Sequence, residues 1–190
     1  MATVDAEKKL QKRVLHWLVN DLGYTYLGNL EDIDNTPVKE DLLKANLKKR
    51  GYSDDQIKTA ISELLSKVNN QVDSLYQINR SVYSLLRYGR QGAKDANGRR
   101  QTVHYINWDD IGSNDFYVAE EVSVLRFDKV TRKRPDVVLY INGIALGVFE
   151  LKSYYVSALN GIIQMLQNHK RENILNFFST AKFLFAGNES

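Results

Sequence analysis

The sequence has no cysteine, and only two prolines and three histidines in 190 residues. The lack of cysteine excludes a disulfide framework and thiolate metal sites, and the histidines are too scattered to form a zinc site. No apolar run reaches the ~18 residues that suggest a membrane span, so no membrane partner is expected. Residues 1–7 lack the basic and apolar segments of a signal peptide, and we expect a cytoplasmic protein.

The composition is typical of a globular domain. Hydrophobic residues make up 43% of the chain, which excludes a disordered or collagen-like protein. The length predicts one compact domain, or one domain with an insertion. The 26 Lys and Arg against 23 Asp and Glu give a formal net charge of +3. This mild basicity permits a polyanionic partner without requiring one, so the placement of the charges matters more.

Helical periodicity dominates the first half of the chain. Thr36 is a suitable N-cap for a helix with Pro37 at its first position, and Ser53 with Gln56 predicts a capping box for the next helix. Gly89 is expected to end a later helix. We interpret residues 36–69 as a helical insertion on the side of a sheet domain. The predicted helices are residues 5–22, 36–50, 53–68, 71–88 and 157–173.

Strand patterns dominate the second half. Residues 137–141 and 144–151 are almost continuously apolar and are joined by Asn142-Gly143, the strongest hairpin signal in the chain. Because both faces of these runs are apolar, we expect the hairpin at the centre of a sheet covered on both sides. The phenylalanines 177, 178, 183 and 185 are expected in the core. Further strands are predicted at residues 24–30, near 102–106, at 117–127 and, buried, at 181–186. Together these elements predict an α/β fold, a mixed central sheet flanked by helices.

Charged residues stand at both ends of the predicted hairpin. Asp136 follows Pro135 at the start of the first strand, and Glu150, Leu151 and Lys152 end the second. Acids and a lysine are costly beside a buried hairpin unless they are paired or bind a metal. Glu150 and Lys152 point to one face, and the Leu151 carbonyl lies near the same edge. Two carboxylates and a carbonyl suit Mg²⁺, and a lysine could assist a metal-bound water. The plainer alternative is a structural Glu150–Lys152 salt bridge.

The register of the hairpin limits this interpretation. An ideal two-residue loop at Asn142-Gly143 pairs Asp136 with Phe149, which leaves Asp136 and Glu150 on opposite faces. A shared site therefore requires a bulge, a three-residue loop, or an Asp136 that lies just before regular pairing begins. We predict such an irregularity.

The two charged ends resemble the PD-(D/E)xK nuclease signature. More closely, the run from Arg134 to Lys152 resembles the nuclease domain of the restriction (R, motor) subunit of type I restriction-modification enzymes. Residues 114–122, 79–89 and 161–170 are similar to that domain as well. The resemblance implies a single endonuclease domain over residues 1–190, with a PD-(D/E)xK core and the helical insertion at 36–69.

The resemblance also implies roles for individual residues. Asp136 and Glu150 would bind catalytic Mg²⁺, with Leu151 beside them, and Lys152 would assist the attacking water. Gln164 matches the first part of a Gln-x-x-x-Tyr signature that supports the site. The family tyrosine is replaced by Asn168, which puts that half of the signature in doubt. Some of these nucleases add an acid from the first helix, and the candidate here is Glu7.

Two basic stretches could contact DNA phosphates, although such stretches are more often solvated surface. Arg132, Lys133 and Arg134 lead directly into Asp136 and are the predicted DNA-binding residues. The stretch 89–101 reads as an exposed loop or hairpin tip. It and the arginines just before it could follow DNA or contact another domain.

The resemblance places the chain in a larger assembly. The family subunit continues into helicase-like motor domains that use ATP, whereas this sequence has no Gly-x-x-x-x-Gly-Lys-Ser/Thr loop, so we expect a fragment that does not itself bind ATP. The implied partners are double-stranded DNA and the methylation and specificity subunits. Two alternatives stay open: another PD-(D/E)xK nuclease, or a non-catalytic DNA-binding or subunit-docking module on the same fold.

Overall fold

A computed structural model describes residues 2–188, with side chains from residue 6 onward. Its centre is a mixed five-stranded sheet in the order β1-β4-β7-β8-β9. The inner strands β4, β7 and β8 are antiparallel, and the outer strands β1 and β9 pair with them in parallel. The predicted fold class is confirmed. The strands are β1 (Thr25–Asn29), β4 (Phe116–Glu120), β7 (Val137–Ile141), β8 (Ile144–Leu151) and β9 (Phe183–Gly187).

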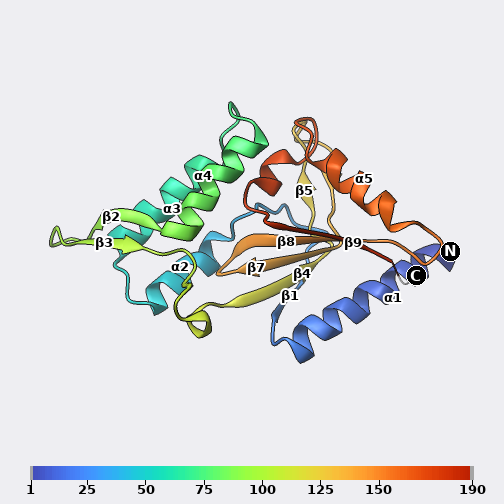
Figure 1. Ribbon diagram of the computed structural model, residues 1–190, viewed down its shortest axis with the longest axis horizontal. Helices are drawn as coiled ribbons and strands as arrows, with labels where there is room; N and C mark the ends of the chain where they lie inside the picture. Colours follow the sequence, from blue (N-terminus) through green and yellow to red (C-terminus); the bar gives the residue numbers. More distant parts are fainter. Residues whose placement is uncertain (1, 189–190) are drawn as a thin grey trace.

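Helices lie on both sides of one end of this sheet (Figure 1). On one side α1 (Ala2–His16), continued by a π-helical turn (Trp17–Asp21), packs Leu15 and Leu18 against Val137 and Leu151. On the other side lie α5 (Ala158–Asn168) and a 3₁₀ turn (Leu175–Ser179). The β7–β8 hairpin is therefore covered on both faces, as its continuous apolar runs predict.

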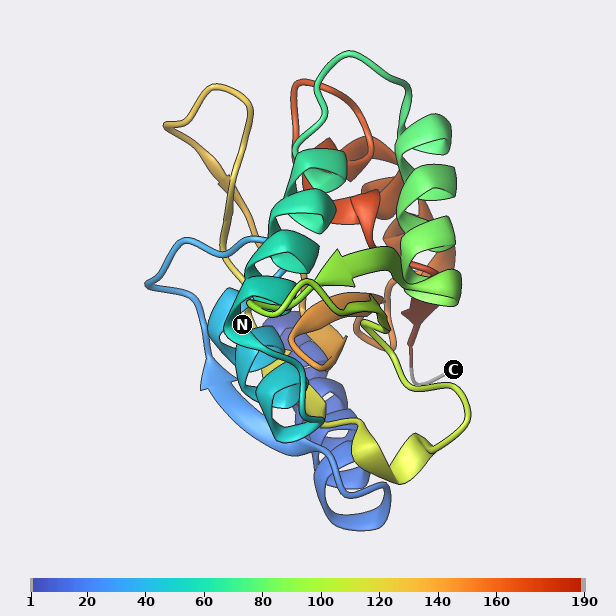
Figure 2. The same cartoon turned by 90° about the vertical axis from the view of Figure 1, so that its left-hand side faces the viewer.

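The far end of the molecule holds three more helices and a hairpin around a second core (Figure 2). Ile144 and Leu146 of β8 contribute to this core, so it is continuous with the sheet. The capping box of Ser53 and Gln56 is confirmed at the start of α3, and Gly89 ends α4 at φ 75°. The basic stretch 89–101 forms a hairpin with an exposed tip. The elements are α2 (Glu40–Lys49), α3 (Asp54–Val68), α4 (Leu75–Tyr88), β2 (Arg90–Lys94) and β3 (Arg100–Val103).

The predicted helix start at Thr36-Pro37 is wrong. Residues 37–39 extend along the hairpin turn: Val38 forms a bridge to Ile144, and the Lys39 N–H donates to the Gly143 carbonyl at 2.8 Å. Helix α2 begins only at Glu40. The end of α4 was predicted correctly, but its start lies at Leu75, where Ser74 provides a capping box that the sequence analysis missed.

Two other boundaries and the burial of one strand differ from the sequence expectations. The predicted strand 117–127 is broken after β4, and β5 (Val124–Leu125) pairs instead with β6 (Arg132–Lys133) in a separate hairpin. Helix α5 ends at Asn168, and turns follow it to residue 174. The strand β9 is not buried: it lies at the sheet edge, where Phe183 is 61% exposed and Phe185 42%. Of the four phenylalanines predicted in the core, Phe177 and Phe178 belong to it, whereas Phe183 and Phe185 do not.

Within residues 2–188, no helix is both long and apolar enough to cross a membrane.

Candidate active site

A bulge in the β7–β8 hairpin sets the geometry of the site. Near the turn, Ile141 pairs with Ile144 and Tyr140 with Ala145, but farther along Leu139 pairs with Gly147 and Val137 with Phe149. Leu146 is thus the extra residue of the bulge. The predicted irregularity is confirmed. The shift places Asp136, just before β7, level with Glu150 rather than with Phe149.

Asp136 is held in place by backbone groups on two neighbouring segments. Its side chain is buried, and Oδ2 accepts a 2.5 Å hydrogen bond from the Leu151 N–H. The backbone carbonyl of Asp136 accepts a hydrogen bond from the Glu121 N–H at 2.9 Å. The Leu151 amide is a contact that the sequence analysis did not anticipate, because it depends on the shifted register. It fixes the position of Asp136 relative to the end of β8.

Glu150, Lys152 and Glu7 meet beside Asp136. The Lys152 ammonium lies 2.7 Å from Glu150 Oε1 and 4.0 Å from Glu7 Oε1, so α1 does bring an acid to this end of the sheet. Glu150 is only 1% exposed. Among the described residues, its second oxygen, Oε2, is buried without a hydrogen-bond partner. A buried carboxylate oxygen left in that state is unfavourable unless a cation or a proton occupies it.

Burial makes both central acids hard to ionise. Burial and the charge of Glu150 raise the pKa of Asp136 to about 7, although the Leu151 N–H and Lys152 oppose the shift. Burial likewise raises the pKa of Glu150, against the ion pair with Lys152. For Lys152, burial lowers the pKa, but Glu150, Asp136 and Glu7 together outweigh it, so its pKa is raised. The site therefore combines two carboxylates that hold their protons more strongly than usual with a lysine that stays protonated.

These residues fit a small hard cation. The unpartnered oxygen of Glu150 and the carboxylate of Asp136 are the oxygen ligands that Mg²⁺ prefers, and a cation would relieve their mutual repulsion. Among the described side chains, no three His, Asp or Glu groups converge into a closed metal site. Water, backbone carbonyl or phosphate oxygens would complete the coordination, which is usual for Mg²⁺.

Helix α5 packs closely over Glu150. A Cβ on Gly161 would lie 3.1 Å from the Glu150 carbonyl oxygen, so a larger residue here would require the helix or the strand to shift by a few tenths of an ångström. Gln164 lies one turn farther along α5 and is half-buried. Asn168, in place of the family tyrosine, is buried, and its Oδ1 has no hydrogen-bond partner among the described residues. The supporting role of Gln164 stays a prediction.

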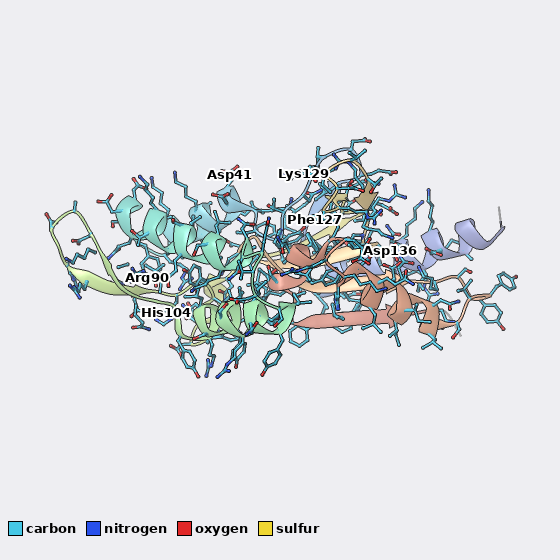
Figure 3. The ribbon with its side chains drawn as sticks, turned by 90° about the horizontal axis from the view of Figure 1, so that it is seen from above. Asp41, Arg90, His104, Phe127, Lys129 and Asp136 are labelled. Carbon is cyan, nitrogen blue, oxygen red and sulfur yellow. The ribbon has the colours of Figure 1, made fainter. Side chains whose placement is uncertain are left out.

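The basic residues before Asp136 are largely engaged with acids. Arg132 pairs with Asp34 at 3.3 Å, and Arg134 pairs with Glu121 at 2.6 Å and also contacts Glu31. The positive charge of Lys133 lowers the pKa of Glu150. The DNA-binding roles of Arg132, Lys133 and Arg134 stay predictions, and those of the arginines now compete with ion pairs. The other basic stretch is remote, because Arg90 and Asp136 lie toward opposite ends of the molecule (Figure 3).

Comparison with known proteins identifies the family of the chain. Residues 6–190 match the family described as the N terminus of the type I restriction enzyme R protein. The chain belongs to this family. One relative, named as a candidate type I restriction enzyme MjaIXP endonuclease subunit from Methanocaldococcus jannaschii, is 26% identical over 147 residues. Another, the type I restriction enzyme HindI endonuclease subunit from Haemophilus influenzae, is 29% identical over 94 residues.

These matches cover only part of each protein. They include 71% and 48% of this chain, but only 14% and 9% of the respective relatives. The chain therefore corresponds to a small part of the curated relatives that it matches.

Proposed function

We propose that this domain is a Mg²⁺-dependent endonuclease that hydrolyses phosphodiester bonds in double-stranded DNA. The observation that carries the proposal is the hairpin bulge, which brings Asp136 level with Glu150 while Lys152 stays paired with Glu150. The names of the two relatives as endonuclease subunits support the same activity.

Asp136 and Glu150 would hold the cation. When bound, Mg²⁺ would lower the pKa of a water and polarise the phosphate. Asp136 is kept in position by the Leu151 N–H, and the bulge keeps Glu150 on the same side. Because the pKa of Asp136 is raised, a cation that binds near neutral pH must displace a proton from the pair of Asp136 and Glu150.

Lys152 would act on the phosphate. Its raised pKa keeps it protonated, and its pairing with Glu150 and Glu7 holds the ammonium at the edge of the site. A fixed cation there stabilises negative charge that develops on phosphate oxygens during hydrolysis, without the cost of reorganising solvent. It can also hydrogen-bond the attacking water and orient it.

The wider setting is part of the proposal. In the full-length subunit, motor domains would use ATP to translocate DNA, and cleavage would follow translocation. Methylation and specificity subunits would be the protein partners, and the assembly would work in the cytoplasm. Gln164 would support the site from α5, and Lys133 would contact a phosphate near Asp136.

Calorimetric titration with Mn²⁺ tests the proposal. Wild-type protein should bind the ion, whereas Asp136→Asn and Glu150→Gln should each lose the binding while circular dichroism stays unchanged. The matched control is Asp41→Asn, because Asp41 is an exposed acid at the start of α2, remote from Asp136 (Figure 3). Equal binding in all four proteins, also with duplex DNA present, would contradict the proposal and favour a non-catalytic DNA-binding or docking module.

A further inference from the structure

Glu121 adopts an unusual backbone conformation next to the site. It follows β4 directly and has φ 51°. The two other described non-glycine residues with positive φ, Lys129 and Asn142, lie in hairpin turns, where this conformation is common. Outside a turn the conformation costs a residue such as glutamate ~1–2 kcal/mol, so other contacts must hold it.

Those contacts hold residues 134–136, the segment that carries Asp136, in position. The Glu121 N–H donates to the Asp136 carbonyl at 2.9 Å, and the Val122 N–H donates to the Pro135 carbonyl at 3.0 Å. The Glu121 carboxylate adds an ion pair, with Oε2 lying 2.6 Å from Arg134 Nε. The side chain of Glu121 is only 14% exposed, whereas that of Arg134 is 45% exposed, so the ion pair is buried on the glutamate side. Backbone and side chain of one residue thus hold residues 134–136.

The same carboxylate reaches α1. Gln11, which is buried, donates from Nε2 to Glu121 Oε1 at 3.3 Å and to Glu120 Oε2 at 2.7 Å. Glu7 lies one turn before Gln11, so the two share a face of α1. Glu7 in turn lies 4.0 Å from the Lys152 ammonium. Glu121 therefore joins two segments that approach the site from different directions.

We infer that Glu121 is a positioning residue, whose carboxylate, shared by Arg134 and Gln11, sets the places of Asp136 and Glu7 relative to Glu150 and Lys152. The inference deepens the proposed function and rests on it. It also assigns Arg134 a different part from the one that the sequence suggests. Arg134 acts through Glu121 on the geometry of the site, rather than on a DNA phosphate.

Amide hydrogen exchange at Leu151 reports this role directly, because its N–H is bonded to Asp136 Oδ2. Glu121→Gln and Arg134→Ala should each speed exchange of the Leu151 amide by about tenfold, and the double variant should add little, since both changes remove one link. The Ala145 amide, bonded to the Pro37 carbonyl near the other end of β8, should keep its wild-type rate and shows that the fold is intact.

The matched control is Glu120→Gln. Glu120 also accepts from Gln11, but Arg134 pairs with Glu121. This variant should leave Leu151 exchange and Mn²⁺ affinity at wild-type levels, whereas Glu121→Gln should weaken Mn²⁺ binding by about tenfold at unchanged thermal stability. If Glu121→Gln also speeds exchange of the Ala145 amide, this variant disturbs the fold as a whole. Arg134→Ala, which keeps Glu121 in place, then decides the question.

Several results would overturn the inference. Wild-type Leu151 exchange in both Glu121→Gln and Arg134→Ala would do so, and so would equal acceleration in Glu120→Gln. A third is an Arg134→Ala variant with normal Leu151 exchange whose DNA affinity depends less steeply on salt, because that marks a phosphate contact. A wild type that binds no Mn²⁺ would instead contradict the proposed function, and the exchange measurement would still test the link.

Discussion

The strands β8 and β9 are neighbours that are both mostly apolar but have opposite surroundings. They lie in the same sheet and pair in parallel. Yet β8 is buried along almost its whole length, whereas Phe183, Leu184 and Phe185 of β9 are exposed. The difference is one of position in the sheet, because β8 has a strand on each side and β9 lies at the edge. An apolar run predicts a strand, but it does not predict what covers that strand.

The surface around β9 continues the contrast. Helix α5, which packs beside β9, buries Gly161 and Met165 but leaves a row of apolar side chains exposed. They are Leu159, Ile162, Ile163 and Leu166. The β7–β8 hairpin, which carries Glu150, is therefore closely packed, whereas the neighbouring edge strand is sparsely covered. This arrangement makes the hairpin the part of the molecule where substitutions should cost most.

Truncating an apolar side chain in each strand gives the largest expected difference. Ile144→Ala in β8 should lower the free energy of unfolding by about 2–5 kcal/mol, because Ile144 is fully buried between the sheet and the second core. Leu184→Ala in β9 should cost less than about 1 kcal/mol. Urea unfolding followed by circular dichroism measures both. Equal losses would mean that β9 is as well covered as β8.

The pH dependence of stability tests the buried acid Asp136, which lies level with the end of β8, whereas β9 carries no ionisable side chain. Asp136 has a pKa of about 7 in the folded state, above its unfolded value, so the folded protein holds this proton more tightly. The contribution of Asp136 to stability should be greatest below pH ~4 and fall as the pH rises to ~7, by at most about 4 kcal/mol. Unfolding in the presence of a chelator measures the slope.

Asp136→Asn is the control for this slope. The amide cannot ionise, so the fall in stability between acid and neutral pH should become clearly smaller, and the remainder comes from Glu150, whose pKa burial also raises. An unchanged slope in the variant would show that Asp136 is not responsible for it.

Two glycines test whether the bulge is closely packed. A Cβ on Gly147 in β8 would lie 3.2 Å from Leu139, so Gly147→Ala should destabilise by about 1–3 kcal/mol as the bulge adjusts. A Cβ on Gly187 in β9 would meet nothing within 4 Å, so Gly187→Ala should change stability by less than about 0.5 kcal/mol. Thermal unfolding measures the stability of both variants. If Gly147→Ala costs no more stability than Gly187→Ala, the bulge is loosely packed.

The smallest effect on stability is expected at the edge itself. An exposed apolar edge strand favours edge-to-edge association, and a lysine there opposes it. Leu184→Lys should leave the free energy of unfolding within about 0.5 kcal/mol and reduce self-association at high concentration. Sedimentation velocity measures the association. Unchanged sedimentation of a self-associating protein would show that β9 is not the contact.

Local patterns were sufficient for much of the fold. The apolar runs around Asn142-Gly143 predicted the hairpin, and its charged ends together with the register required an irregularity, which Leu146 provides. The capping box at Ser53 and the helix end at Gly89 depend on nearby residues and were also predictable.

The errors came from contacts between distant segments. Thr36 and Pro37 favour a helix start, but pairing of Val38 with Ile144 keeps this segment extended. The strand after Glu120 breaks because the Glu121 and Val122 amides turn toward residues 135 and 136. In the site, Glu150 and Lys152 followed from their spacing, whereas the contacts of Gln11, Glu121 and the Leu151 amide required the folded structure.

Paramagnetic broadening by Mn²⁺ tests most directly whether the bulge builds a cation site from Asp136 and Glu150. At substoichiometric Mn²⁺, the amide signals of Leu151 and Lys152 should broaden first, while those of Ala93 in the distant β2–β3 hairpin should stay sharp. Asp136→Asn should abolish the selective broadening. Broadening that begins elsewhere, or that is uniform along the chain, would contradict the account.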